Sequence, residues 1–361
     1  MEKELFIKQL RPYLYLMDEA HEATGYIVVG DEKVCVIDTM NGYNDLYKVV
    51  RGITDKPIVV INTHGHPDHI LGNVYFEEAY MNPRDNELAE SFIKDPEFLK
   101  QCEKAGLSMP SFKPIKGGDV IELGGKTLEI YDLPGHTQGG ILLLLKEDRI
   151  LFTGDSINHH LWMQLDGCLP MADFVKELDK VMFLENEADF ILHGHATDFD
   201  DISLMHCLRE GAVEICEGKT ENDLPYKWFG GEDRQHPFKL EEGKHYQQME
   251  SVICYRIRRT RMVKHVILWT LKDELTAEEK ITIKQGIKEG LEGLKGKVPG
   301  IVEIKVNIDG LASSNADLML DSVFEDEASL KGYAVHPAHV AVATQIVRPK
   351  VKNRVCMDYE E

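Results

Sequence analysis

The sequence of 361 residues has no apolar run of the roughly 20 residues that cross a bilayer, so we expect no transmembrane helix and no membrane partner. The first ten residues lack the long apolar core of a secretory signal. The seven cysteines form no C-x-x-C pair, and such an odd, scattered set predicts reduced thiols in a cytoplasmic protein. Acidic residues outnumber basic ones by 62 to 41, a formal net charge of −21 that argues against a nucleic-acid partner.

What is present is enough apolar sequence for two domains, with 43% hydrophobic residues. The charge is distributed unevenly along the chain. Residues 261–361 carry 14 basic and 16 acidic side chains, whereas the preceding 260 residues carry 27 basic and 46 acidic side chains. This shift predicts a boundary near residue 260, within an arginine-rich stretch, and hence domains of residues 1–259 and 260–361.

Apolar strand-like runs and amphipathic helical segments are intermixed in the first domain, and polar clusters repeatedly follow the strands. Residues 217–250 are polar, and we expect loops there. This layout predicts sheets with helices packed outside and a functional site on the loops at the strand ends. The predicted strands comprise residues 13–16, 24–30, 33–39, 57–62, 125–133, 140–147, 149–154 and 189–195, and the predicted helices residues 44–53 and 172–183.

The most specific motif is THGHPDH, which directly follows the predicted strand of residues 57–62. Alternation along an extended backbone sends the imidazoles of His64 and His66 to the same side. Asp68 and His69 come next, on the following turn or helix start. A single His-x-His is common in proteins without a metal, but four potential ligands within six residues are typical of a metal site.

Three more potential ligands each follow an apolar strand: His136 in LPGHTQGG, Asp155 in LFTGDS and His195 in LHGHATD. Imidazole and carboxylate ligands without thiolate suit zinc, with iron or manganese as alternatives. Five histidines and two aspartates can hold two divalent ions, and two ions that share a water lower its pKa enough to give hydroxide at neutral pH. The predicted arrangement has Asp155 as the bridge between one site of His64, His66 and His136 and a second site of Asp68, His69 and His195.

In these motifs, residues 1–259 resemble the metallo-β-lactamase-fold hydrolases, the superfamily that includes glyoxalase II, lactonases, ribonuclease Z-type enzymes and the β-lactamases. The resemblance implies an α+β chain whose first domain is an αββα sandwich, with the seven residues above as metal ligands at one edge of the two sheets. Two features depart from the family pattern: the TQGG that follows His136, and His193 where a proline is common. Both concern the substrate pocket and leave the metal ligands intact.

The resemblance implies a dinuclear metal-dependent hydrolase, in which a metal-bridging hydroxide attacks an ester, thioester, lactone or amide carbonyl of a small-molecule substrate. Asp155 as the bridge and Asp68 as a proton carrier are the expected catalytic residues. Two alternatives stay open. One is a phosphodiesterase on the same metal centre, and the other is a non-catalytic small-ligand binding or sensor protein dimerised by its second domain.

Residues beside the motifs are candidates for supporting roles. His159, His160 and Trp162 follow LFTGDS in SINHHLWMQLDG and are predicted to line the substrate pocket. The alternative for these three is a solvated loop with a core tryptophan. Asp38 in VIDT ends a predicted strand, and we expect it to orient a metal-binding imidazole by accepting its second N–H.

Residues 262–350 show a fresh strand–helix–strand–strand–helix–strand order, the ferredoxin-like plan. Thr276, with a glutamate three residues later, opens the long helix as a capping box. A helical segment over 329–344 is broken by a proline, and AVATQIVRPKV (341–351) is predicted to supply the last strand. The first strand, 262–269, has apolar residues on both faces, so one face is expected to meet the helices and the other a partner.

The motifs MVKHVILWTLKD and GYAVHPAHV in these residues are similar to those of the stress-responsive A/B barrel domain, in the dimeric α+β barrel superfamily. The resemblance implies a homodimer formed through residues 262–350. Some members of that family act on polyketides with a tyrosine and a histidine, which correspond here to Tyr333 and His339, with His265 nearby as a further pocket residue. The alternative is that these side chains only pack in the domain or cap a helix.

Overall fold

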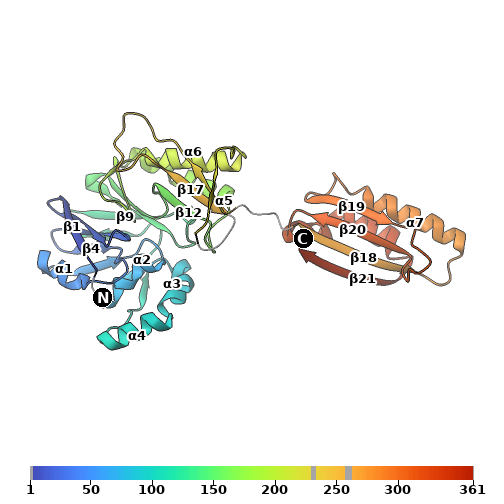
Figure 1. Cartoon of the computed structure of the whole chain (residues 1–361), viewed down its shortest axis with the longest axis horizontal. Coiled ribbons are helices and arrows are strands. Elements are labelled where there is room, and N and C mark those ends of the chain that lie inside the picture. Colours follow the sequence, from blue (N-terminus) through green and yellow to red (C-terminus); the bar gives the residue numbers. More distant parts are fainter. Residues whose placement is uncertain (1–2, 229–232, 257–261, 361) are drawn as a thin grey trace. The chain divides into compact units, whose positions relative to one another are not determined.

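A computed structural model describes residues 3–228, 233–256 and 262–360 of the chain. The chain divides into two compact units, Met1–Ile257 and Arg258–Glu361, which run from blue to yellow and from orange to red in Figure 1. The boundary that the charge shift predicts near residue 260 lies outside the described residues. Within the described ranges, no helix is long and apolar enough to cross a membrane.

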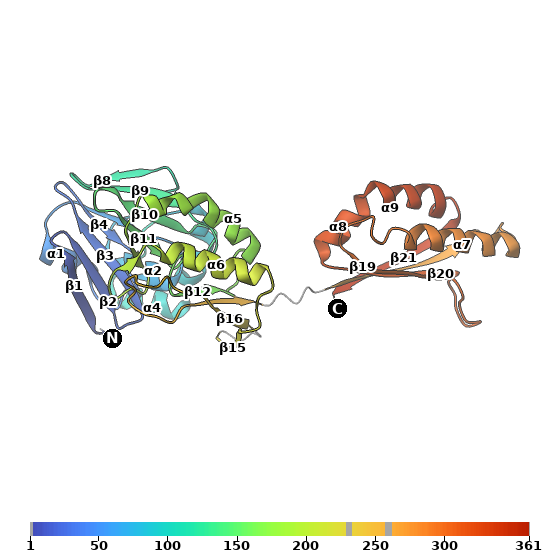
Figure 2. The same cartoon turned by 90° about the horizontal axis from the view of Figure 1, so that it is seen from above.

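The first unit contains two large β-sheets (Figures 1 and 2). In the first sheet, β1 to β4 are antiparallel neighbours and β4 to β7 are parallel ones. Its strands β1 to β7 follow chain order, with bounds Leu5–Arg11, Leu14–Glu19, Ala23–Val29, Val34–Ile37, Ile58–Ile61, Ala79–Met81 and Phe112–Pro114. The second sheet has the order β14-β13-β11-β10-β9-β8, and the bounds of β8, β9, β10, β11, β13 and β14 are Val120–Glu122, Thr127–Asp132, Ile141–Leu145, Ile150–Gly154, Phe190–His193 and Asp200–Asp201.

Apolar side chains of the two sheets pack against each other, and helices cover the outer faces. The central layer joins Tyr26 and Ile37 of the first sheet to Leu143 and Phe152 of the second. β10 is buried along its whole length because both of its faces are covered. α1 packs on the outer face of the first sheet, and α5 and α6 pack on that of the second (Figure 2). This arrangement confirms the αββα sandwich.

The helices of the first unit are α1 (Leu46–Ile53), α2 (Pro67–Ile70), α3 (Asn86–Ile93), α4 (Pro96–Ala105), α5 (Met171–Val181) and α6 (Leu204–Cys216). Short helical turns are η1 (Leu71–Tyr75), η2 (Pro83–Asp85), η3 (Lys146–Asp148) and η4 (Met182–Asn186). They connect the strands or extend the longer helices, so most of the functional motifs fall on short segments at strand ends.

A third, four-stranded sheet has the order β12-β17-β16-β15. β12 (His160–Met163) pairs in parallel with β17 (Val252–Arg256), while β16 (Asp233–Pro237) pairs antiparallel with both β17 and β15 (Leu224–Tyr226). The expectation of loops throughout 217–250 was therefore wrong for β15 and β16. Both strands contain proline and lack an alternating apolar pattern, and they owe their extended form to backbone pairing with β17.

The second unit, by itself, is one antiparallel sheet with its helices on one face (Figure 2). The strand order β19-β20-β18-β21 confirms the ferredoxin-like plan. Along β18, alternate side chains from Val263 to Leu271 are buried under the helices. The elements are β18 (Val263–Leu271), α7 (Ala277–Glu292), β19 (Ile301–Asn307), β20 (Leu318–Phe324), α8 (Glu327–Val335), α9 (Pro337–Val342), the wide helical turn η5 (Ala343–Val347) and β21 (Val351–Glu360).

The structure contradicts the prediction of a last strand over 341–351. Most of this segment stays helical, as the end of α9 and η5, with Val342 packed against the core of the unit and Val347 buried within it. Apolar residues in this stretch fit either a strand or a helix, and packing decides for the helix. β21 begins only after Pro349, which has no N–H with which to continue a helix.

Candidate metal centre

The THGHPDH motif follows β5 directly, where this strand ends at one edge of the first sheet. His66 is the N-cap residue of α2, and Pro67 occupies the first helical position, where a missing N–H costs nothing. Asp68 and His69 therefore lie on the short helix itself, as the motif predicts. Both face the same cluster as the two histidines that precede them.

The other three candidate ligands come from the second sheet. His136 follows β9, Asp155 follows β11 and His195 follows β13. Because β11 and β13 are parallel neighbours, the residues that follow them meet at the same edge of the sheet. The structure brings all seven side chains together in two groups, each with its potential ligand atoms within 4.8 Å of one another: His64, His66 and His136, and Asp68, His69, Asp155 and His195.

The carboxylate of Asp155 lies between these two groups. Its Oδ2 atom is 3.2 Å from Nε2 of His195 and 3.6 Å from Nε2 of His69, both in the second group. The same oxygen is 3.9 Å from Nε2 of His136, which belongs to the first group. One carboxylate oxygen thus faces imidazoles of both groups.

Several buried polar atoms of the cluster have no hydrogen-bond partner among the described residues. They are Nε2 of His64, Nε2 of His69 and Oδ1 of Asp155. Buried polar atoms in proteins are normally paired, because an unpaired one costs free energy. Imidazole nitrogens and carboxylate oxygens that converge in this way fit a divalent metal ion. The cluster is therefore a candidate divalent-metal site.

Burial and charge act differently on the two groups. In the first group, burial holds the pKa of His64 well below its usual range and lowers the pKa of His136, which favours the neutral form that ligates a metal. In the second group, burial lowers the pKa of His195, but the carboxylates of Asp155 and Asp68 together outweigh burial and the net pKa is raised. The second group therefore has an excess of negative charge, which favours a cation.

Asp38 has the position expected of a residue that orients a ligand. Its Oδ2 atom lies 2.8 Å from Nδ1 of His69, on the ring side opposite the unpaired Nε2. The backbone N–H and the hydroxyl of Thr63 both donate to the Asp38 carboxylate, each over 2.7 Å. Asp38 has a φ of +58°, a left-handed conformation that aspartate adopts more readily than most residues. These bonds determine which nitrogen of His69 faces the cluster.

A buried hydrogen-bond network, which no sequence motif indicates, supports the loop that carries His195. Nε2 of His193 lies 2.8 Å from Nε2 of Gln247, and the backbone N–H of Gln247 donates to Asp200 over 2.8 Å. His159 joins the same network, with its Nε2 3.0 Å from Asp200. The sequence marks His193 only as a departure from a family pattern.

The structure does not place His159 with the other two predicted pocket residues. Its ring is fully buried, and Nδ1 lies 2.7 Å from the hydroxyl of Ser251. Because Nε2 of His159 lies within hydrogen-bond distance of Asp200, both ring nitrogens of His159 have partners inside the fold. His160 and Trp162 lie beside the cluster instead, with the Trp162 ring 5.3 Å from that of His195.

Two aromatic residues near the cluster were not predicted. Nε1 of Trp162 donates to the hydroxyl of Tyr226 over 3.0 Å, and the ring of Trp228 lies 5.5 Å from that of Trp162. Both residues come from the stretch expected to be loop. The one available signal is the presence of aromatic residues in an otherwise polar segment.

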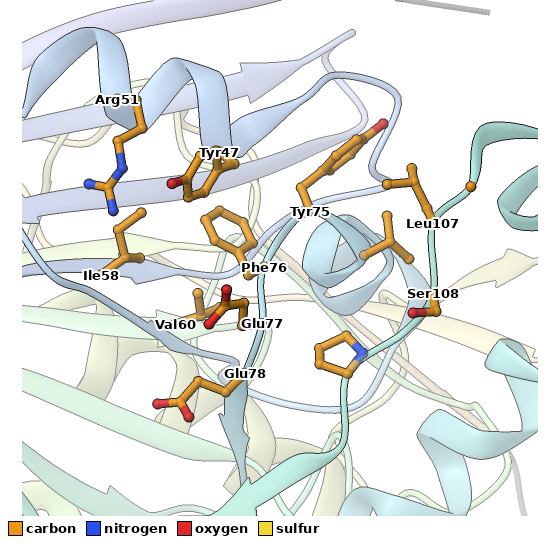
Figure 3. Close-up of a pocket in the computed structure, with 13 residues that line it drawn as sticks. Tyr47, Arg51, Ile58, Val60, Tyr75, Phe76, Glu77, Glu78, Leu107 and Ser108 are labelled. Atoms are coloured by element: carbon orange, nitrogen blue, oxygen red, sulfur yellow. The ribbon is translucent and has the colours of Figure 1, made fainter. Parts of the chain in front are cut away.

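A separate surface pocket lies between α1 and the segment that follows α4 (Figure 3). It has a volume of about 730 Å³. Tyr47 and Phe76 line it on one side with Arg51 above them, and Leu107 and Ser108 lie across from them. The side chains that line it include none of the seven candidate metal ligands.

In the second unit, the structure brings together the three predicted pocket residues. The ring of Tyr333 lies 4.1 Å from that of His339 and 6.1 Å from that of His265. The Tyr333 side chain is buried, and its hydroxyl has no hydrogen-bond partner among the described residues. His265 is also close to β21, with Nδ1 2.5 Å from the carboxylate of Asp358.

Comparisons with known proteins agree with both resemblances. Residues 21–195 match the family model described as Metallo-beta-lactamase superfamily, and residues 263–361 match the model described as Stress responsive A/B Barrel Domain. All seven clustered side chains lie within the first match. The matched ranges also cover the predicted pocket residues of the second unit.

Among curated proteins, the acyl-coenzyme A thioesterase MBLAC2 of Gallus gallus is 26% identical over 208 residues, which cover 50% of this chain and 75% of that protein. The hydroxyacylglutathione hydrolase GloC of Haemophilus influenzae is 30% identical over 141 residues, covering 36% of this chain and 64% of the relative. The atrochrysone carboxyl ACP thioesterase AgnL7 of Paecilomyces divaricatus is 28% identical over 139 residues, which cover 37% of this chain and 39% of that protein.

Proposed function

Residues 21–195 belong to the metallo-beta-lactamase superfamily and residues 263–361 form a stress-responsive A/B barrel domain, and from this premise we propose that the chain is a dinuclear metal-dependent thioester hydrolase that dimerises through its second domain. That the chain is a metallohydrolase follows from the superfamily and from the hydrolases and thioesterases related to it. The observation that carries the finer proposal is the convergence of seven ligand-type side chains, six of them around Asp155, with three buried atoms that have no hydrogen-bond partner among the described residues.

We assign the seven side chains to two divalent ions, with Asp155 between them. His64, His66 and His136 would hold one ion, and Asp68, His69 and His195 would hold the other. A ligand set of imidazoles and carboxylates without thiolate suits zinc best, ahead of iron or manganese. When bound, the ions supply a water molecule of lowered pKa and a Lewis acid for the carbonyl oxygen of the substrate.

The chain's own residues then orient the ligands and move the proton. The Asp38 carboxylate and the carbonyl of Trp162 fix the rings of His69 and His136 through their Nδ1 atoms. The Asp68 carboxylate lies 3.5 Å from Nε2 of His69 and is 29% exposed, unlike the buried Asp155. Asp68 Oδ2 can therefore take the proton of the attacking water and release it to solvent.

A thioester is the bond type that the relatives support. Two of the three relatives described above are named as thioesterases, of an acyl-coenzyme A and of an acyl carrier protein. Within the chain, the net charge of −21 disfavours a polyanionic nucleic acid as the substrate of a phosphodiesterase. A non-catalytic role is disfavoured because all seven side chains are kept at ligand distance.

The test is a substrate panel on the zinc-loaded full-length chain. We expect hydrolysis of a simple acyl thioester, and little turnover of a matched lactone or of a phosphodiester. Turnover of the phosphodiester alone would replace the proposal with the phosphodiesterase alternative. Full metal occupancy without turnover of any substrate would favour a binding or sensor protein.

The proposed dimer rests on the sheet face of the second unit that its helices leave open. On this face Leu268 pairs with Val355, and Val266 pairs with Met357 on the neighbouring strand. Leu268, Val355 and Met357 are 37%, 63% and 66% exposed. A second copy of the same face would cover these apolar side chains on both chains at once.

A further inference from the structure

Aromatic rings gather on one side of the candidate metal centre. The Trp162 ring lies edge-on to the imidazole of His195 with centroids 5.3 Å apart, and it stacks on the ring of His160 at 4.5 Å. Trp228 adds a second indole 5.5 Å from Trp162, and the Tyr226 ring lies 5.6 Å from that of His160. We call His160, Trp162, Tyr226 and Trp228 the aromatic wall.

The aromatic wall is held in place by the third sheet. β12 carries His160 and Trp162, and β15 ends at Tyr226, whose hydroxyl accepts a hydrogen bond from the Trp162 indole over 3.0 Å. Nε2 of His160 lies 3.1 Å from the thiol sulfur of Cys254 on β17. These contacts fix the rings of His160, Trp162 and Tyr226, so a ligand that binds to these three rings loses little free energy in ordering them.

The wall is also tied directly to the metal centre. The backbone carbonyl of Trp162 accepts a hydrogen bond from Nδ1 of His136 over 2.6 Å. A group that lies against the Trp162 ring is also close to the imidazole of His195, whose centroid is 5.3 Å from that ring. The acyl part of a substrate can reach this position, because it is bonded to the carbonyl carbon that reacts at the centre.

The rings of the wall remain accessible to a ligand. His160, Trp162 and Tyr226 are half-buried, and Trp228 is 45% exposed. Large aromatic side chains that stay accessible beside a polar cluster are typical of a binding surface, since burying them in the core would release more free energy. The four side chains that define the wall have no carboxylate or ammonium group, and an uncharged planar group can pack against their rings.

We propose that the aromatic wall binds the acyl group of the substrate and selects a planar aromatic acyl group over a saturated one of the same size, an inference that rests on the thioester hydrolysis proposed above. Aromatic rings attract one another in offset-stacked and edge-to-face arrangements with centroids at about 4.5–7 Å, which are the arrangements within the wall itself. A saturated ring buries a similar apolar area without this attraction. The expected preference for the aromatic group is about three- to tenfold, the size of one such ring contact.

The experiment compares two thioesters of N-acetylcysteamine, one benzoyl and one cyclohexanecarbonyl, on the zinc-loaded full-length chain. The wild-type kcat/KM is expected to favour the benzoyl thioester by about three- to tenfold. Trp228→Leu should bring this ratio toward one, because it removes an exposed ring of the wall. Phe183→Leu is the matched control: Phe183 is 49% exposed and packs against Tyr131 instead, so the ratio should stay at the wild-type value.

Equal kcat/KM values for the two thioesters in the wild type would overturn the inference, and so would a preference that Trp228→Leu leaves intact. If neither thioester is hydrolysed, the proposed function fails and calorimetry with benzoate and cyclohexanecarboxylate decides the inference alone. Tighter binding of benzoate that is lost in Trp228→Leu would support the wall as an aromatic subsite. Equal binding of the two acids would refute it.

Discussion

At the scale of single residues, Asp155 has its two carboxylate oxygens in different surroundings. Oδ2 faces three imidazoles within 3.9 Å, whereas Oδ1 is buried without a hydrogen-bond partner among the described residues. Asp155 would serve two ions as a shared carboxylate ligand, and a buried Oδ1 without a partner among the described residues fits a ligand of a cation. The side chains around it are themselves oriented by Asp38 and the carbonyl of Trp162.

Asp155→Ala should lower kcat/KM for the thioester by more than about a hundredfold. This loss is larger than the loss from mutating a residue that only hydrogen-bonds to a metal ligand. The variant keeps the fold, because β11 and its neighbours are held by apolar packing on both faces. The rate and the metal content are measured side by side, with circular dichroism as the control for folding. A wild-type rate in the variant would show that Asp155 is not the bridge.

Gly194, directly before His195, is a second residue on which the cluster depends. A Cβ atom at this position would lie 2.3 Å from Oδ1 of Asp155 and 2.6 Å from the His69 ring. Gly194→Ala should therefore displace these side chains, weaken metal binding and lower the stability of the first unit by about 1–3 kcal/mol. Thermal unfolding and metal titration measure the two effects.

The matched control for this change is Gly52→Ala. Gly52 is in α1, and a Cβ there has no neighbour within 4 Å, so alanine should leave the first unit unchanged or slightly more stable. If both variants melt and bind metal alike, the close packing of Gly194 against the cluster does not matter for the site.

The residue scale also shows what the sequence could predict. The seven candidate ligands could be predicted from the sequence because each follows an apolar strand within a short, recognisable motif. His159 and His160 could not be told apart, because adjacent residues of an extended chain point to opposite sides and the sequence does not say which side faces the centre. The structure has His159 inside the hydrogen-bond network of Asp200 and His160 beside Trp162.

At the scale of elements, the third sheet is the part of the first unit that was not predicted from the sequence. Its central contact pairs β12 with β17, which are about 90 residues apart in the sequence, as His160 with Val252. Local patterns of apolar residues cannot reveal such a long-range pairing, and β15 and β16 form only alongside it. For this reason Trp162 could be proposed as a pocket residue while Tyr226 and Trp228 could not.

The capping box of α7 gives a prediction that belongs to the element scale. The Thr276 hydroxyl accepts from the backbone N–H of Glu279, and the Glu279 carboxylate accepts from the backbone N–H of Thr276. Thr276→Ala should destabilise the second unit by about 1 kcal/mol. Chemical denaturation of the full-length chain measures the loss.

Thr282→Ala, later in the same helix, is the control. Among the described residues, its hydroxyl bonds only back to the carbonyl of Glu278, so the change should be neutral or slightly stabilising. An equal loss from both threonines would contradict the prediction, because the loss from Thr276→Ala could then not be assigned to the cap.

At the scale of the whole molecule, the open sheet face of the second unit predicts a homodimer. Leu268→Asp should convert the full-length chain to a monomer, because a charge would be buried at the centre of the proposed interface. Light scattering measures the molar mass. Ile281→Asp is the matched control: Ile281 is 69% exposed on α7 rather than on the open sheet face, and its variant should stay dimeric.

A monomeric wild-type chain would refute this dimer. A dimer that survives Leu268→Asp would have its interface elsewhere in the molecule.

The central claim is that the seven clustered side chains hold two divalent ions, and elemental analysis of the purified full-length chain tests it most directly. The ligand set predicts about two ions per chain, zinc foremost, after growth with zinc or iron. The result is read against Asp155→Ala, which should hold markedly less metal. A well-folded wild-type chain that stays free of metal after such supplementation would contradict the account.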